Sequence, residues 1–138
     1  MGGKNINILV LDEENSVFSE LPRFLEDKGY NVVSSNDSEQ AFEYLKKNAV
    51  HIAIVDISVP SIEGISLLGM IKDANVLTQI IMMGTSVTAD KLIASFESGV
   101  NDFILKHSST LDHVASVVEE SEKKLLRWQN VFKNLGVI

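Results

Sequence analysis

The segment His51-Ile52-Ala53-Ile54-Val55-Asp56 decides the fold, because it is a short apolar run that ends in a single carboxylate. Two turn residues, Pro60 and Gly64, follow soon after it. A short run of β-branched and small apolar residues before a turn is typical of a strand that is buried on both faces. In open parallel sheets, ligands bind at the carboxyl ends of the strands. The position of Asp56 therefore predicts a functional centre at that edge.

Composition predicts one ordinary globular domain with an acidic surface. The chain has 138 residues, of which 45% are hydrophobic and 22% are charged. Its formal net charge of −7 argues against direct nucleic-acid binding, since phosphate binding needs a basic stripe. We find neither a membrane-spanning apolar run nor the apolar core of a signal peptide. The absence of cysteine excludes disulfides and thiolate metal sites, and we expect a cytoplasmic location.

Five apolar runs alternate with five helical patterns along the chain. We expect strands at residues 6–11, 30–34, 51–56, 79–83 and 102–105. The first helix is expected over 15–28, with Val17 and Phe18 on its buried face, and Pro22 should kink or split it. Further helices are expected over 37–48, 64–74 and 88–98, and from residue 109 or 110 onward. Such alternation implies a parallel sheet that is covered by helices on both faces and joined by right-handed crossovers.

Residues that could take part in a functional site follow four of the five strands. They are the acids at 12–14, Asp56, the Gly84-Thr85 pair and Lys106. Each of these alone has a structural explanation: Asp56 as a turn or helix cap, Lys106 as a surface lysine. Together they converge on one edge of a parallel sheet, and this favours a shared site.

Several carboxylates in one crevice repel each other, and a divalent cation would resolve that repulsion. Oxygen ligands without Cys or His suit Mg²⁺ or Mn²⁺ better than zinc. A carboxylate can also act as the nucleophile in phosphoryl transfer, which gives an acyl phosphate. A nearby cation such as Lys106 would offset the added negative charge.

Three motifs give the chain a specific resemblance. They are Ile8-Leu9-Val10-Leu11-Asp12-Glu13-Glu14, Asp56-x-x-x-Pro60-x-x-x-Gly64 and Gly99-x-x-Asp102-Phe103-Ile104-Leu105-Lys106. Over residues 5–122 the chain resembles the receiver domain of bacterial two-component response regulators. The resemblance implies an α/β fold of the flavodoxin-like, doubly wound type. Its five-stranded parallel sheet would have the order 2-1-3-4-5 and be packed by five helices, with the last helix extended in this chain.

The resemblance also implies a role for each site residue. Asp56 would accept a phosphoryl group from a histidine kinase or phosphotransfer protein, Lys106 would contact that group, and Phe103 would be the switch aromatic. The metal ligands would be Asp12, Glu13, Asp56 and the backbone carbonyl of Ser58. The protein would then be a signalling phosphoacceptor and not an enzyme, with slow autodephosphorylation as its only catalysis.

Three positions depart from the family pattern. Glu13 replaces the second aspartate of the usual acidic pair, but it keeps the charge and can still reach a metal. Gly84 stands where the family carries the Thr or Ser whose hydroxyl binds the phosphoryl group, and the neighbouring Thr85 should point to the opposite face of the strand. This leaves open a pseudo-receiver that works as a phosphate-independent interaction or dimerisation module. His107 replaces the proline that follows the lysine, and we therefore expect a trans Lys106–His107 bond.

Two enzymes of similar architecture fit the residues less well. A haloacid-dehalogenase-type phosphatase would need a second aspartate at position 58, where this chain has Ser58. A flavodoxin would need a phosphate-binding loop in place of the acids at 12–14.

The last helical pattern continues past the end of a receiver domain. Apolar positions recur in steps of three and four, typical of a heptad seam: Leu111, Val114, Val118, Ser121, Leu125, Trp128, Phe132 and Leu135. We expect residues 123–138 to form a helical extension, with Leu125 and the later apolar residues beyond the domain body. Such a helix would form a homodimer or lead into an output domain absent from this chain. The alternative is a tail that folds back on its own domain or is left disordered.

Overall fold

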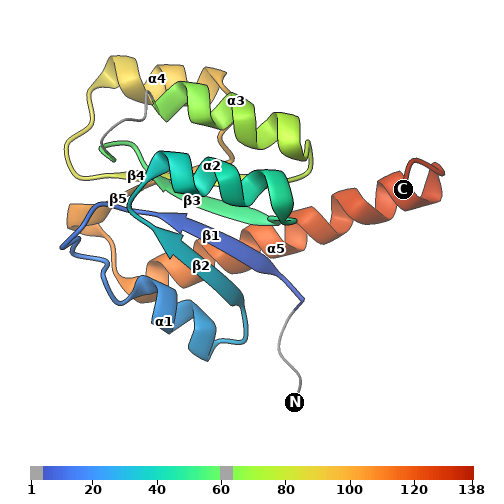
Figure 1. The fold of residues 1–138 in the computed structure, drawn as a ribbon, viewed down its shortest axis with the longest axis horizontal. Coiled ribbons are helices and arrows are strands. Elements are labelled where there is room, and N and C mark those ends of the chain that lie inside the picture. The colour runs from blue at the N-terminus through green and yellow to red at the C-terminus, as the bar shows by residue number, and fades with distance from the viewer. Residues whose placement is uncertain (1–4, 60–63) are drawn as a thin grey trace.

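The computed structural model describes residues 5–59 and 64–138, so Pro60 of the second motif lies outside the described residues. Five parallel strands form one sheet in the order β2-β1-β3-β4-β5, which confirms the predicted fold (Figure 1). The strands are β1 (Asn7–Leu11), β2 (Asn31–Ser35), β3 (Ile52–Asp56), β4 (Gln79–Gly84) and β5 (Asp102–Leu105).

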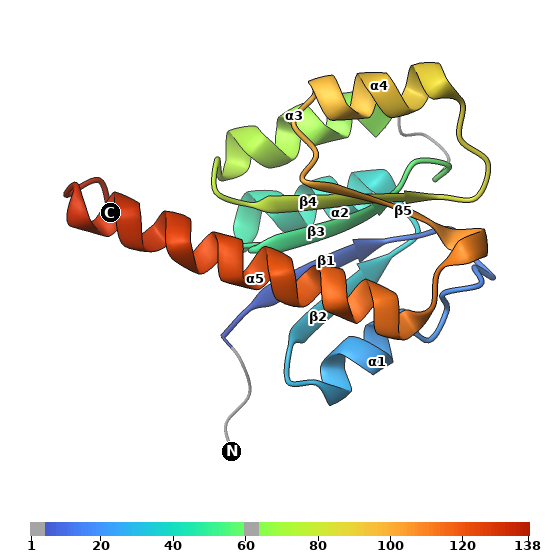
Figure 2. The ribbon, with the colours of Figure 1, turned by 180° about the vertical axis from the view of Figure 1, so that it is seen from behind.

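Helices cover both faces of this sheet. They are α1 (Leu21–Asp27), α2 (Ser38–Lys47), α3 (Gly64–Ala74), α4 (Ala89–Glu97) and α5 (Leu111–Asn134), with a short 3-10 helix η1 at Lys106–Ser108. Helices α1 and α5 lie on one face, and α2, α3 and α4 lie on the other (Figures 1 and 2). None of the helices in the described residues is long and apolar enough to cross a membrane.

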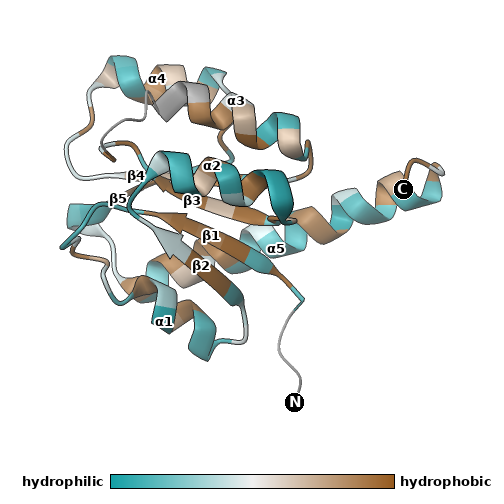
Figure 3. Cartoon of the chain, in the orientation of Figure 1, coloured by the Kyte–Doolittle hydropathy of each residue, from teal (hydrophilic) through white to brown (hydrophobic). Residues whose placement is uncertain are grey.

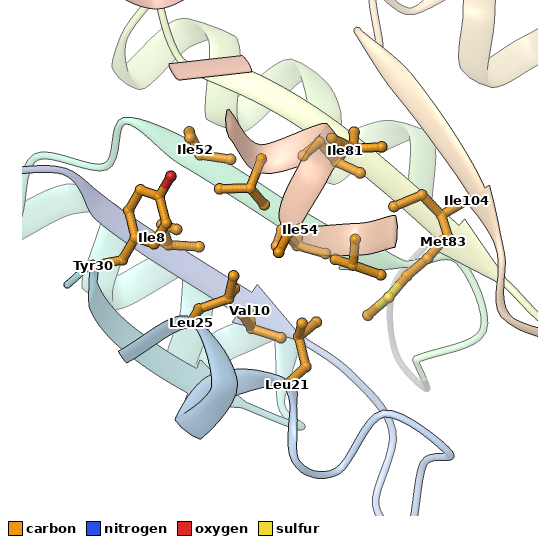
Figure 4. Packing of buried hydrophobic residues seen from close by; sticks show 14 of the residues in the cluster. Ile8, Val10, Leu21, Leu25, Tyr30, Ile52, Ile54, Ile81, Met83 and Ile104 are labelled. Atoms are coloured by element: carbon orange, nitrogen blue, oxygen red, sulfur yellow. The ribbon is translucent and has the colours of Figure 1, made fainter. Parts of the chain in front are cut away.

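The central strands are apolar on both sides because each face meets a layer of helices. All five residues of β3 and all six of β4 are buried. Figure 3 shows these strands as predominantly hydrophobic beside helices of mixed character. Alternate residues supply the two halves of the core; those that face α1 and α5 include Ile8, Val10, Ile52, Ile54, Ile81 and Met83 (Figure 4).

Helix α1 is shorter than the sequence pattern predicted. It begins at Leu21, with Pro22 in its first turn, where the missing N–H of proline costs no hydrogen bond. The prediction of a helix from residue 15 is therefore wrong. Phe18 is buried as expected, but Val17 is 70% exposed, because the residues before Leu21 form turns and do not present one helical face.

Helix α5 continues past the edge of the sheet, as Figure 2 shows. Thr110 caps its first turn by accepting a hydrogen bond from the amide of His113. Leu125 is 1% exposed and belongs to the core beneath the sheet. The prediction that Leu125 lies beyond the domain body is therefore wrong, because the packed part of α5 extends at least to this residue.

Candidate functional site

Three charged side chains from separate strand ends meet at the carboxyl edge of the sheet. Asp12 follows β1, Asp56 ends β3, and Lys106 follows β5. The Lys106 Nζ atom lies 2.5 Å from Asp56 Oδ2 and 2.7 Å from Asp12 Oδ1. The structure thus brings together residues that lie 50 and 94 positions apart in the sequence. The predicted convergence at this edge is confirmed for these three residues.

Asp56 is fully buried, and both of its carboxylate oxygens have partners. Oδ1 accepts hydrogen bonds from the Ser58 amide at 2.7 Å and from the Ser58 hydroxyl at 2.6 Å, while Oδ2 accepts from Lys106. Burial by itself would raise the pKa of Asp56, but the hydrogen bonds from Lys106 and Ser58 outweigh it and hold that pKa below its usual value. The carboxylate is therefore ionised and held in a fixed orientation.

The ammonium of Lys106 balances the buried carboxylate of Asp56 and the half-buried one of Asp12. Burial would lower the pKa of Lys106, but hydrogen bonds to Asp12 and Asp56 raise it above the usual value. Burial raises the pKa of Asp12, and hydrogen bonds from Lys106 and Ser16 offset only part of that rise. One cation between two acids leaves the site with excess negative charge, which is a reason for it to attract a further cation.

Lys106 begins the short helix η1, so its backbone turns away from the sheet at once. The Lys106–His107 bond is trans, as predicted, and no cis peptide bond occurs within residues 5–59 and 64–138. The ring centroid of Phe18 lies 6.0 Å from the Lys106 ammonium. An apolar side chain thus covers the lysine on the side of the α1 loop.

Glu13 joins the site through Ser58. The Ser58 hydroxyl lies 3.1 Å from Glu13 Oε2, and the Glu13 side chain is 41% exposed. No group of three or more potential metal ligands is closely clustered in the part of the chain that the structure describes. The oxygen-only donor set nevertheless has the chemistry that Mg²⁺ prefers, and the Lys106 ammonium lies between two of the acids. The predicted role of the Ser58 backbone carbonyl stays a prediction.

Gly84 ends β4 beside Leu105 of β5, and its surroundings leave no room for a side chain. A Cβ atom at this position would lie 2.7 Å from Val87 Cγ2 and 3.0 Å from Ile57 Cγ2. It would also lie 3.7 Å from the ring of Phe103, which is half-buried against the core of α2 and α3. Apolar groups thus fill the space that the hydroxyl side chain implied by the resemblance would need at position 84.

Sequence reasoning missed Val87, Ile57 and Ser16. The loop residue Val87 has no motif that would mark it, and only the glycine at position 84 hinted at a close neighbour. Thr85 is half-buried, and no hydrogen bond joins it to Asp12, Asp56 or Lys106 among the residues described. This arrangement therefore does not support the idea that the Thr85 hydroxyl takes the place of the one missing at position 84.

An open hollow of about 390 Å³ lies beside the acids, between the ends of β1 and β2. Asp12 and Glu13 line it, together with Ser19, Ser35 and Gln40, but Asp56 does not. The strand ends, and not this hollow, determine the chemistry argued above. The hollow offers an approach to the half-buried acids Asp12 and Glu13.

Comparison with known proteins agrees with this geometry. A sequence model described as the response regulator receiver domain matches residues 8–119. The response regulator GtcR of Aneurinibacillus migulanus is 32% identical over 110 residues, which are 80% of this chain and 45% of that protein. The regulatory protein VanRc of Enterococcus gallinarum is 28% identical over 110 residues, or 47% of its length. The chain thus spans about half the length of these curated relatives.

Solved structures show the same fold. A CheY-like receiver domain protein from Methanospirillum hungatei superposes with a TM-score of 0.82 at 19% identity, covering 88% of this chain and 97% of that one. A response regulator from Thermotoga maritima gives a TM-score of 0.73 at 26% identity, covering 84% and 96%.

Proposed function

We propose, since the chain belongs to the response regulator receiver domain family of two-component signalling, that Asp56 accepts a phosphoryl group from a histidine kinase or a phosphotransfer protein. The observation that supports this most strongly is the state of Asp56 itself. It is a buried, ionised carboxylate that Ser58 and Lys106 hold at the carboxyl edge of the sheet. A purely structural acid would not need two neighbouring acids and one shared lysine.

The proposed reaction moves one phosphoryl group. A carboxylate oxygen of Asp56 attacks the phosphorus of a phosphohistidine, the P–N bond breaks, and its electron pair returns to the imidazole. The product is an acyl phosphate on Asp56. Lys106, whose ammonium already binds this carboxylate, is placed to move its hydrogen bond to a phosphoryl oxygen and offset the added charge.

Mg²⁺ or Mn²⁺ is the proposed cofactor. Asp12, Glu13, Asp56 and the Ser58 carbonyl would hold it, and when bound it would neutralise charge on the acids and the phosphoryl oxygens. The excess of carboxylate over ammonium at this edge supports such a site. Beyond this transfer we propose no enzymatic activity, except slow loss of the phosphoryl group to water.

The proposed output is a change in an interaction surface on α4 and β5. This surface exposes four large apolar side chains: Leu92 (45%), Ile93 (55%), Phe96 (77%) and Leu105 (50%). Exposed apolar side chains that gather on neighbouring elements mark interaction sites. Because relatives are about twice as long, we propose that the signal passes to an output domain outside this chain. The cytoplasmic location stays a prediction.

A second candidate, the pseudo-receiver, is favoured by one observation. Val87 and Ile57 close the space at Gly84, so the hydroxyl that would pull the β4 loop toward a phosphoryl group has no room. In this case α4 would present the same surface whether or not Asp56 is phosphorylated.

Intact-mass measurement tests the phosphoacceptor. Protein incubated with acetyl phosphate and Mg²⁺ should gain one phosphoryl group, whereas Asp56→Asn should gain none and the control Asp90→Asn, on exposed α4, should behave as wild type. If wild type gains nothing, the phosphoacceptor proposal fails. Hydrogen exchange of α4 during the same incubation separates the candidates, because a pseudo-receiver that accepts phosphate without switching would show no change there.

A further inference from the structure

The overhanging part of α5 carries an apolar stripe that its own domain covers only in part. Trp128, Val131 and Leu135 lie on one side of the helix in steps of three and four, and their side chains are 49%, 44% and 74% exposed. Phe132 is half-buried, and its ring meets that of Trp128 edge-on, with 6.3 Å between the centroids. The domain therefore buries Leu125, half-buries Phe132, and leaves about half or more of the other three side chains exposed.

A hollow of about 560 Å³ lies along this stripe. Its walls are Trp128 and Val131, with Lys124 and Arg127 from the same helix and Asn101 from the loop before β5. The hollow is at the amino edge of the sheet, opposite Asp56. Beyond it, the chain continues with two more exposed apolar residues, Val137 (62%) and Ile138 (66%).

Charge is divided unevenly between the tail and the body. Residues 123–138 carry four basic residues and no acidic one. Residues 1–122 carry the remaining eight basic residues and all 19 acidic ones, a net charge of −11. A surface that complements this tail must be apolar at its centre and acidic around it. The body of a second copy of the chain supplies the acidic part, and the tail of that copy supplies the apolar part.

We propose that two copies of this chain associate through their α5 tails in antiparallel orientation, about a two-fold axis near Val131. In this register Trp128 of one copy packs against Leu135 of the second, and each contact occurs twice, as symmetry requires. The apolar end of each tail, with Ile138, enters the hollow of the other copy beside Lys124. Each basic tail then lies against the acidic body of its partner.

Electrostatics disfavours the parallel alternative. A parallel pair would place Lys124 beside Lys124 and Arg127 beside Arg127 at the edge of the stripe, and would bring the two acidic bodies side by side. In the antiparallel pair these cations meet the apolar residues at positions 135 and 138, over which their aliphatic stems can lie. Lys133 projects from the other side of the helix, given 3.6 residues per turn, and does not enter the contact.

The stripe is short, so the contact should be small. We expect roughly 1,000 Å² of total buried surface, at the low end of specific interfaces, and hence a weak, concentration-dependent dimer. Trp128 is the only tryptophan in the chain and lies within the proposed contact, so its fluorescence reports on association directly.

Light scattering and Trp128 emission are to be measured from about 1 to 500 µM, the range for weak complexes. Wild type should approach twice the monomer mass of 15.2 kDa, with a blue shift of Trp128 emission at the same midpoint. Val131→Glu should remain monomeric. Leu126→Glu is the matched control, because Leu126 is 50% exposed on the opposite side of α5 and its substitution should leave dimerisation unchanged. A monomer at every concentration, or loss of the dimer only in Leu126→Glu, overturns the proposal.

Disulfide trapping tests the orientation, since the chain has no cysteine of its own. Mixed Lys124→Cys and Ile138→Cys proteins should form a disulfide between unlike copies upon mild oxidation. Lys124→Cys alone should form none, and Leu126→Cys serves as the background control. Efficient pairing of Lys124→Cys with itself would show a parallel dimer and overturn the antiparallel arrangement.

Discussion

Substitution of Gly84 should destabilise the protein through a contact that can be named. The backbone of Gly84 is an ordinary strand conformation, paired with Leu105, so alanine meets no torsional strain there. The obstacle is steric, because the new Cβ would lie 2.7 Å from Val87 Cγ2 and 3.0 Å from Ile57 Cγ2. Both neighbours are β-branched, and their stiff χ1 angles limit how far they can move away.

Two opposing terms set the magnitude. Overpacking of this kind costs about 1–3 kcal/mol, while replacing glycine in a compatible conformation returns about 0.4–1 kcal/mol by restricting the unfolded chain. Gly84→Ala should therefore lower the free energy of unfolding by about 1–2 kcal/mol, and Gly84→Thr by more.

Urea denaturation of a double-mutant cycle checks the assignment. Val87→Ala removes the Cγ2 atom that the new Cβ meets first, so the cost of Gly84→Ala should fall in the Val87→Ala background, where only the contact with Ile57 Cγ2 remains. The coupling free energy should then be about 1 kcal/mol, which is typical of residues in direct contact. Gly69→Ala serves as a control, because nothing lies within 4 Å of a Cβ placed there.

The reasoning is refuted if Gly84→Ala is as stable as wild type, or if Val87→Ala gives no relief. Either result would mean that the β4 loop adjusts freely around position 84. A threonine hydroxyl could then be accommodated, and the pseudo-receiver would lose its main structural support.

Three further predictions concern the site and the core. Lys106→Met should lower the free energy of unfolding by about 2–4 kcal/mol at neutral pH, because it leaves Asp12 and Asp56 without their buried cation. Urea denaturation should show a smaller loss when the same substitution is made in the Asp56→Asn background. Leu125→Ala should cost about 2–4 kcal/mol and Leu126→Ala less than about 0.5 kcal/mol, and equal effects would contradict the packing of α5 beyond residue 122. His51 accepts a hydrogen bond from the backbone amide of Asn7, and burial lowers its pKa below the usual 6.5, so the folded state favours the neutral imidazole. Stability should therefore fall as the pH drops below 6.5, and it should fall less in His51→Gln.

The sheet and the meeting of the acids with Lys106 were predictable because both follow from strand ends. An apolar run that is buried on both faces has few alternatives to a central parallel strand. Once the alternation of strands and helices was read, the position of each strand's last residue placed Asp12, Asp56 and Lys106 at one edge. No knowledge of side-chain packing was needed for that step.

The features that sequence reasoning missed depend on packing between residues that share no pattern. The start of α1 was misplaced because apolar spacing at Val17 and Phe18 resembled a helical face, whereas Pro22 fixed the first turn. The close approach of Val87 to Gly84 could not be predicted, since a single valine in a loop belongs to no periodic pattern. The heptad seam predicted on α5 placed Leu125, Trp128, Phe132 and Leu135 beyond the domain body. The spacing alone could not tell which of these residues the domain itself would cover.

The tail contact should be independent of phosphorylation, for a reason that lies in the packing of α5. The phosphoacceptor edge and the tail are at opposite edges of the sheet, and the helix between them is fixed by fully buried side chains such as Val114, Val118 and Leu125. Close-packed cores resist small displacements, so a change at Lys106 should not shift the far end of α5 unless the helix has a second packed position. The midpoint of dimerisation should therefore agree within about twofold between untreated and acetyl-phosphate-treated protein. A tenfold change that is absent in Asp56→Asn would show instead that α5 itself is the moving part.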